Sequence, residues 1–167
     1  MTLRIGYLFV VALLCTTVGA NRASAQLREK KTIGLEAARK MAAAAEAEAV
    51  RRKASIVVAI ADDGGHLVFL ERMDGTQYGI MDATIEKTRT SSGFPESTRF
   101  FENQIARGGE GLAFLSMPNL AAKAGGFPVV VNGEQVGSLA VGGGMDEIDD
   151  ACARAALAAI SAEWPEK

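Results

Sequence analysis

The stretch Asp62-Asp63-Gly64-Gly65-His66-Leu67-Val68-Phe69-Leu70-Glu71-Arg72-Met73-Asp74 decides how this chain is expected to fold. Its first four residues are a tight-turn signal, because glycine adopts positive φ without steric cost. The apolar run before the turn, residues 55–61, has the β-branched side chains of a buried strand, and residues 66–73 fit the returning strand. The stretch therefore predicts an antiparallel hairpin with His66 beside its turn and Arg72 at its far end.

The segments around this hairpin alternate between helical and strand patterns. Helices are predicted for residues 35–53, 80–92, 97–106 and 146–161, and a second hairpin for residues 127–131 and 134–141. Two hairpins with helices before, between and after them favour an α+β fold, in which helices pack on a single antiparallel sheet of about five strands. Helices on both faces of that sheet would explain why residues 55–61 are apolar throughout.

Residue propensities add local expectations. Thr32 is expected to cap the first helix, and Leu35 to lie on its inner face. Residues 112–120 are expected to be irregular. The acidic residues within 146–150 are expected to form a solvated first turn that complements the helix dipole.

The first 25 residues have the three parts of a secretory signal peptide. Arg4 gives a basic start, residues 5–18 are apolar, and Ala23-Ser24-Ala25 is a small-x-small cleavage site. A retained membrane anchor is disfavoured, because this apolar run of about 14 residues is shorter than the ~20 that a spanning helix needs. We expect residues 26–167 to form a single periplasmic or secreted domain, with no membrane contact after signal removal.

The composition of the expected mature chain limits the classes of partner that it is expected to bind. It has 16 basic and 20 acidic residues, no basic stripe, and Cys152 as its one cysteine. Nucleic acid is therefore not an expected partner. With one cysteine no internal disulfide can form, so the hydrophobic core must supply the stability. Cys152 is expected to be a buried structural thiol.

Five motifs in the right order resemble the GlcG/HbpS family, the haem-degrading domain also found as the C-terminal domain of PduO-type proteins. They occupy residues 62–67, 71–75, 85–90, 125–129 and 135–143, and the likeness covers residues 32–163. The resemblance implies a profilin-like sandwich, a homo-oligomer and a small-molecule ligand, which is haem in some exported members. It implies no defined reaction, so enzymatic activity is left open.

His66 is the candidate metal ligand, for haem iron. It is the one histidine of the chain, and imidazole can ligate iron through one nitrogen while the other donates a hydrogen bond. The alternative is a half-solvated histidine beside a turn. His66 and Arg72 are six residues apart along the strand, roughly 20 Å at ~3.3 Å per residue, so within one subunit they cannot both hold a small ligand.

Arg72, Met73 and Asp74 are further candidates for cofactor binding. The Arg72 guanidinium could hold a carboxylate or a haem propionate, oriented by Asp74. Met73 could pack against an apolar ring. The alternative is an ion pair at the strand end beside a core methionine.

Lys87 completes the cofactor-binding candidates, and Lys87 and Arg72 are the catalytic candidates. A partly buried lysine can have a lowered pKa and act as a base, or it can hold an anion. The alternative is an exposed lysine paired with Asp82 or Glu86. The glycine run 142–144 could offer amides to an anion, but the acidic residues after it would repel phosphate, which argues against nucleotide binding.

Three functions are consistent with these features. The first is an exported protein that binds haem or another tetrapyrrole, in haem or iron handling or sensing. The second is a lyase or isomerase acting on a small aromatic or carboxylated metabolite, with Arg72 as anion clamp and Lys87 or His66 as acid or base. The third is a scaffold or a partner-binding subunit, for which a closed surface without a cleft would be the sign.

Overall fold

One antiparallel sheet of four strands organises residues 29–162, which are the residues that this computed structural model describes. The predicted signal peptide lies outside this range. The elements follow one another as α2 (Leu35–Arg51), β1 (Val57–Asp62), β2 (Leu67–Arg72), α3 (Tyr78–Gly93), α4 (Thr98–Arg107), η2 (Gly109–Ser116), β3 (Gly126–Val131), β4 (Glu134–Gly142) and α5 (Asp146–Ala159). The α+β class and both hairpins are confirmed, with four described strands where about five were expected.

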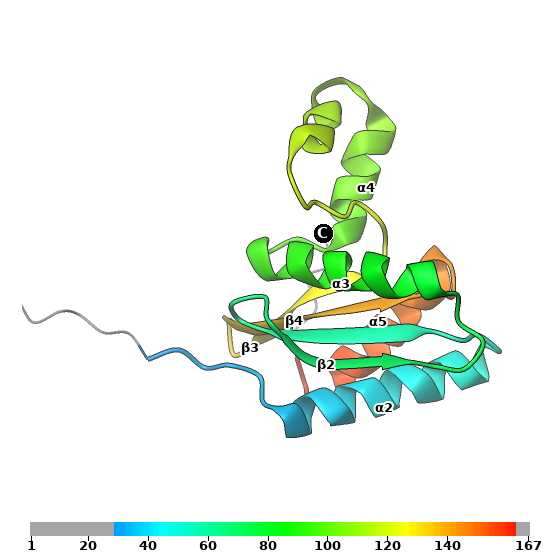
Figure 1. Ribbon diagram of the computed structural model, residues 1–167. Helices are drawn as coiled ribbons and strands as arrows, with labels where there is room; N and C mark the ends of the chain where they lie inside the picture. Colours follow the sequence, from blue (N-terminus) through cyan, green and yellow to red (C-terminus); the bar gives the residue numbers. More distant parts are fainter. Residues whose placement is uncertain (1–28, 163–167) are drawn as a thin grey trace, which may run out of the picture.

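The two hairpins lie side by side in the strand order β2-β1-β4-β3. Strand β1 is internal and pairs with β2 on one side and with β4 on the other, with Val57 opposite both Arg72 and Gly142. Figure 1 shows α3 on one face of the sheet and α2 and α5 on the other. This cover on both faces explains why Val57 to Ala61 are all buried.

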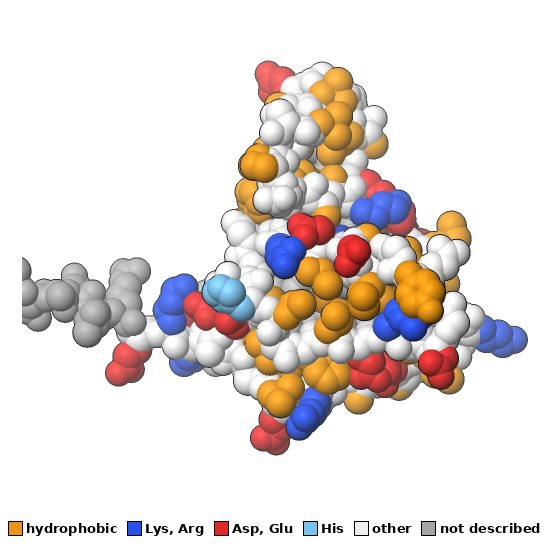
Figure 2. Space-filling model, in the orientation of Figure 1, with side chains coloured by type: hydrophobic (Ala, Val, Ile, Leu, Met, Phe, Trp, Pro, Cys, Tyr) orange, Lys and Arg blue, Asp and Glu red, His pale blue; other side chains and the backbone are white. Residues whose placement is uncertain are grey.

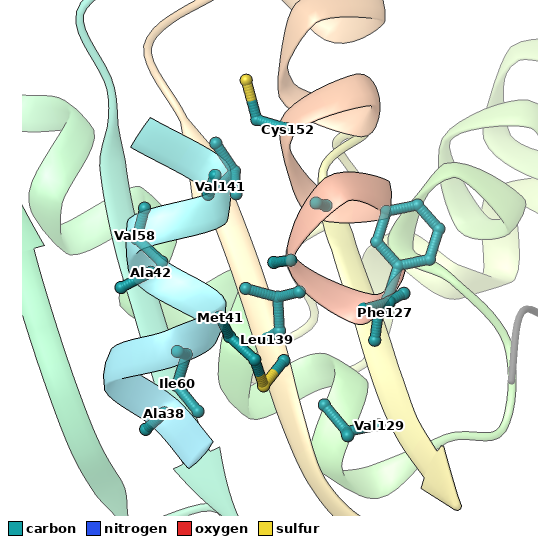
Figure 3. Packing of buried hydrophobic residues seen from close by; sticks show 14 of the residues in the cluster. Ala38, Met41, Ala42, Val58, Ile60, Phe127, Val129, Leu139, Val141 and Cys152 are labelled. Carbon is teal, nitrogen blue, oxygen red and sulfur yellow. The ribbon is translucent and has the colours of Figure 1, made fainter. Parts of the chain in front are cut away.

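The main core lies between the sheet and the pair α2 and α5. Alanines without exposed surface line both helices, and the short side chains let these helices approach each other and the sheet closely. Figure 3 shows Met41 of α2 beside Leu139, with Val129 and Phe127 of β3 completing the layer. Cys152 is buried in this core, and burial raises the pKa of its thiol to about 11, which makes it unreactive.

Helix α3 contacts the other sheet face through small hydroxyl side chains. Thr84, Thr88 and Ser92 each donate a hydrogen bond to the carbonyl four residues earlier in the helix. Ser92 also lies 2.6 Å from Ser138 of β4, hydroxyl to hydroxyl. Because these hydroxyls are hydrogen-bonded within the structure, their bonds offset the cost of removing them from water, and the helix can lie on an apolar sheet.

Three local expectations are wrong. Gly34, not Thr32, is the N-cap of α2, and no side chain caps it. Leu35 is 44% exposed, because the buried face of α2 begins with Ala38. Of residues 112–120, which were expected to be irregular, 112–116 belong to the 3-10 helix η2 and only 117–120 lie outside any helix or strand.

Helices α4 and η2 form an arm that extends from the α3 side of the sheet (Figure 1). Edge-to-face contacts among Phe94, Phe100, Phe101 and Phe114 hold the arm together, with ring centroids 5.0 to 6.3 Å apart. None of the helices in residues 29–162 combines the length and the apolar character needed to cross a membrane.

Candidate functional site

A cleft of about 700 Å³ opens at the end of the sheet where three loops meet. The loop after α2 contributes residues 53–55, the loop after β2 contributes residues 75–77, and the loop after β4 contributes residues 142–146. The pairing of Val57 with both Arg72 and Gly142 brings these loops to one end. The volume of the cleft lies within the ~300–1,000 Å³ of typical ligand pockets.

Lys87 lies in the wall of this cleft, and its side chain is only 4% exposed. Its Nζ donates hydrogen bonds to the carbonyl of Ala124, at 2.8 Å, and to the carbonyl of Val141. Its third partner is Asp149 Oδ2, at 3.5 Å. The alternative of an exposed lysine paired with Asp82 or Glu86 is therefore wrong.

Glycines shape the space around the Lys87 amine. A Cβ at Gly125 would overlap the Val141 carbonyl oxygen and lie 2.9 Å from Nζ, and Gly125 has φ of +104°. A Cβ at Gly142 would overlap the Thr84 hydroxyl. The glycines at 125 and 142 are thus required by close packing around α3, so the run 142–144 needs no bound anion to explain it.

Burial acts on both members of the Lys87–Asp149 pair. Burial lowers the pKa of Lys87 and raises the pKa of Asp149, while their mutual attraction opposes both shifts. Asp149 Oδ1 also accepts a hydrogen bond from the Gly144 amide at 2.8 Å. Three acceptors around the amine and an amide donor on the carboxylate favour the charged forms, so the cleft holds an internal ion pair.

Two of the four acidic residues at the start of α5 are buried, which corrects in part the expectation of a solvated turn; Glu147 is exposed and Asp146 is half-buried. Asp149 and Asp150 are 5% and 6% exposed. Asp150 accepts a hydrogen bond from Arg99 Nε at 2.5 Å, which ties the arm to α5. The helix dipole accounts for the acidic residues there only in part, because basic partners from α3 and α4 neutralise them.

A second ion pair crosses the mouth of the cleft. Lys123 Nζ lies 2.6 Å from Asp146 Oδ2 and 2.6 Å from Glu102 Oε1. The hydrogen bond from Lys123 lowers the pKa of Asp146, and the two carboxylates raise the pKa of Lys123. The positive charge of Lys123 is thus already compensated within the protein.

Arg72 supports the cleft from outside. Its guanidinium donates a hydrogen bond to the Thr76 carbonyl at 2.7 Å and lies over the Tyr78 ring, 4.8 Å from the centroid. Thr76 lines the cleft, whereas Arg72, Met73 and Asp74 do not. Met73 packs against the hydrophobic core, and Asp74 is exposed. The structure therefore brings Lys87 together with residues 75–77 in the wall of the cleft. It leaves Arg72, Met73 and Asp74 outside the cleft.

His66 lies at the opposite end of the hairpin, beside the β1–β2 turn, as the sequence predicts. Its side chain is 83% exposed, and its Nδ1 lies 3.3 Å from Asp62 Oδ1. Figure 2 shows the pale-blue histidine on the surface at the end of the face. Within residues 29–162, no three His, Cys, Asp or Glu side chains are grouped as a metal site would require.

Sequence reasoning did not single out Lys53, Ser55 and Thr76, which also line the cleft. Each belongs to a loop that joins two elements, and only the strand register brings these loops together. One signal was available in the sequence: the glycines at 125 and 142 mark positions where a buried side chain of α3 approaches the backbone.

Comparison with known proteins places the chain in a family. Residues 33–158 match the model of a family described as haem degrading protein HbpS-like. The chain is 34% identical over 115 residues to protein GlcG of Escherichia coli strain K12, an alignment that covers 69% of this chain and 84% of GlcG.

Solved structures agree with this assignment. Protein ORFY of Klebsiella pneumoniae superposes with a TM-score of 0.75 and 28% identity, over 83% of this chain and 97% of ORFY. A PduOC:haem complex shares the fold, with a TM-score of 0.72 and 22% identity over 79% of this chain and 97% of that chain. The chain therefore belongs to the HbpS-like family.

Proposed function

We propose that this protein binds haem or another tetrapyrrole in the cleft beside Lys87 and takes part in haem or iron handling or sensing. The observation that carries the proposal is the cleft of about 700 Å³ in a member of a family described as haem degrading. A relative of the same fold was crystallised as a haem complex.

The chemistry of the cleft suits such a ligand. Ala54, Ile80, Ala83 and Ile148 line it with apolar side chains that can pack against a porphyrin ring. Met145 lies at the rim with an 82% exposed side chain, and its thioether is a known type of axial ligand for haem iron. Bound haem would supply iron redox chemistry, while these residues would bind the ring and exclude water from it.

A hemin titration of the purified protein tests the proposal. A shifted Soret band that saturates at a defined stoichiometry supports it, and no specific band rejects it. His66→Ala separates the two possible locations of the haem. A ligand in the cleft leaves the band of this variant unchanged, whereas haem bound through His66 at the hairpin tip loses intensity.

Export is part of the same proposal. Its support is the three-part pattern of residues 1–25, with Ala23-Ser24-Ala25 before the expected cleavage point. Expression of the full chain in a bacterium should yield a periplasmic or secreted protein that begins at Gln26, as read by intact-mass spectrometry. A cytoplasmic product that retains Met1 would contradict export.

Self-association into a homo-oligomer is the third part of the proposed function. Strand β2 is an edge strand with one free side, and Leu67 and Leu70 are 42% and 38% exposed on it. Figure 2 shows hydrophobic side chains gathered on the face that β2 and α3 form. Light scattering should give a homo-oligomer for the wild type and a smaller species for Leu70→Lys, and a monomeric wild type would reject this part.

A lyase or isomerase is the second candidate, and the Lys87–Asp149 pair favours it. Two buried ionisable groups in the wall of a cleft are a common arrangement for proton transfer. Arg72 would then act by bracing the Thr76 loop rather than by clamping the substrate. Turnover of a small carbonyl or carboxylate compound that is lost in Lys87→Met but retained in Arg89→Met would support this candidate.

A further inference from the structure

Lys53 occupies a backbone position that normally favours glycine. The Ala54 amide donates a hydrogen bond to the Ala49 carbonyl, at 2.9 Å, and the Lys53 amide donates to the Val50 carbonyl, at 3.1 Å. These are the two bonds of a Schellman motif, which ends a helix with one residue in the left-handed conformation. Lys53 is that residue, with φ of 58°. The fold by itself would favour glycine or asparagine here.

The side chain at this position belongs to the cleft. Lys53, Lys87 and Lys123 line it together with Asp146 and Asp149, which leaves an excess of one positive charge. Among the residues that line the cleft, basic groups thus outnumber acidic groups by one, whereas the whole chain has a formal charge of −2.

Among the three lysines, only Lys53 has its charge free. Lys87 is paired with Asp149, and Lys123 with Asp146 and Glu102. Within residues 29–162, the Lys53 ammonium has no hydrogen bond or ion pair, and neither does the neighbouring Ser55 hydroxyl, which also lines the cleft. A cation and a hydroxyl donor therefore lie unpaired at the same side of an otherwise compensated cleft.

We propose that Lys53 binds a carboxylate of the ligand at the mouth of the cleft, with the Ser55 hydroxyl as a second donor, so that the cleft selects anionic ligands. This proposal rests on the proposed function in one respect: it takes haem as the ligand, and the propionates of haem are carboxylates. An ammonium beside a hydroxyl suits a carboxylate, because both donate hydrogen bonds to oxygen and the ammonium also supplies charge.

The variant Lys53→Gly tests this role against a purely structural one. Removal of the left-handed lysine should raise Tm by about 3 °C. Loss of the cation should weaken hemin binding about tenfold, in the Soret titration, as expected for one charge-assisted contact. A merely structural residue would show the first effect without the second.

Ser161→Gly is the matched control. Ser161 holds the same position after α5, with φ of 56° and its amide bonded to the Ala158 carbonyl, and it does not line the cleft. This control should raise Tm and leave hemin affinity unchanged. Hemin dimethyl ester, whose propionates are blocked, should bind the wild type and Lys53→Gly equally.

The outcomes separate the two proposals. If hemin binds the wild type and Lys53→Gly with equal affinity, the carboxylate site is wrong and the proposed function stands. If hemin binds neither protein, the proposed function is wrong, and an NMR titration with benzoate decides about the site. Shifts at the amides of residues 53 and 55 that disappear in Lys53→Gly support it, and unshifted amides in the wild type overturn it.

Discussion

At the scale of single residues, Lys87 places a charged ammonium group in the interior of the described fold. An ammonium that is 4% exposed persists because two carbonyls and Asp149 surround it. Its position within 85–90 marked Lys87 as a candidate in the sequence, but its partners come from segments 37 to 62 residues away. Local periodicity alone therefore could not distinguish a buried lysine from an exposed one.

Replacement of Lys87 by methionine should destabilise the protein by about 3 kcal/mol, because Asp149 is left charged and buried without its partner. The urea midpoint of unfolding measures this effect. Adding Asp149→Asn should recover most of the loss, since the amide oxygen still accepts from Gly144. Arg89→Met on the same helix is the control, because the Arg89–Glu86 pair is exposed. A loss as small for Lys87→Met as for Arg89→Met would contradict the burial of a charge.

Asp62 provides a second test at the residue scale. Its Oδ1 accepts hydrogen bonds from the amides of Gly64 and His66, at 2.9 Å each, and the bond from His66 is the main reason that the pKa of Asp62 is lowered. Asp62→Ala should cost about 0.5 kcal/mol, a modest figure because the side chain is partly exposed to solvent. Asp63→Ala, beside it in the same turn, removes the exposed ion pair with Lys30 and should therefore cost less than Asp62→Ala.

The effect of Asp62 should depend on pH in a defined direction. A carboxyl whose folded-state pKa lies below its unfolded value stabilises the fold fully above the unfolded pKa. That contribution is lost as pH falls through the folded pKa. The difference between wild type and Asp62→Ala should therefore be constant at neutral pH and shrink under strongly acidic conditions. A difference that grows on acidification would contradict the assigned bonds.

At the scale of elements, strands and hairpins follow from the sequence more directly than helix faces do. Asp62 to Gly65 and Asn132-Gly133 are local turn signals, and both hairpins form as predicted. The first turn of α5 was predicted less well, because its acidic residues were expected to be solvated whereas Asp149 and Asp150 are buried. Asp149 and Asp150 turn inward because Lys87 and Arg99 meet them there, which a helical periodicity does not encode.

Gly125→Ala tests how tightly β3, β4 and α3 are joined. The new methyl group would overlap the Val141 carbonyl and crowd Nζ of Lys87, so we expect a loss of about 3 kcal/mol or more in the free energy of unfolding. Gly133→Ala is the matched control: Gly133 also has positive φ, of 75°, but no atom would lie within 4 Å of its Cβ. It should cost only the conformational strain, about 1 kcal/mol. Equal losses would show that close packing at Gly125 contributes nothing beyond its φ.

At the scale of the whole molecule, three layers leave one end of the sheet open. The order of hairpins and helices predicts the layers, since an internal strand that is apolar throughout needs cover on both faces. The location of the cleft could not be predicted, because it depends on loops 53–55, 75–77 and 142–146 converging through the strand register. The same register places His66 at the opposite end of the sheet from the cleft. His66 and Lys87 therefore do not belong to one site.

We propose that the ligand binds in the cleft between α3, α5 and the three loops. Hemin titration of Ala83→Trp is the test, because Ala83 lines the cleft and the indole would occupy space that the ligand needs. Ala43→Trp, at an exposed position of α2 outside the cleft, is the control for an added tryptophan. We expect hemin to bind Ala83→Trp at least about tenfold more weakly than the wild type, and to bind Ala43→Trp with wild-type affinity. Equal, wild-type affinity in both correctly folded variants would contradict it.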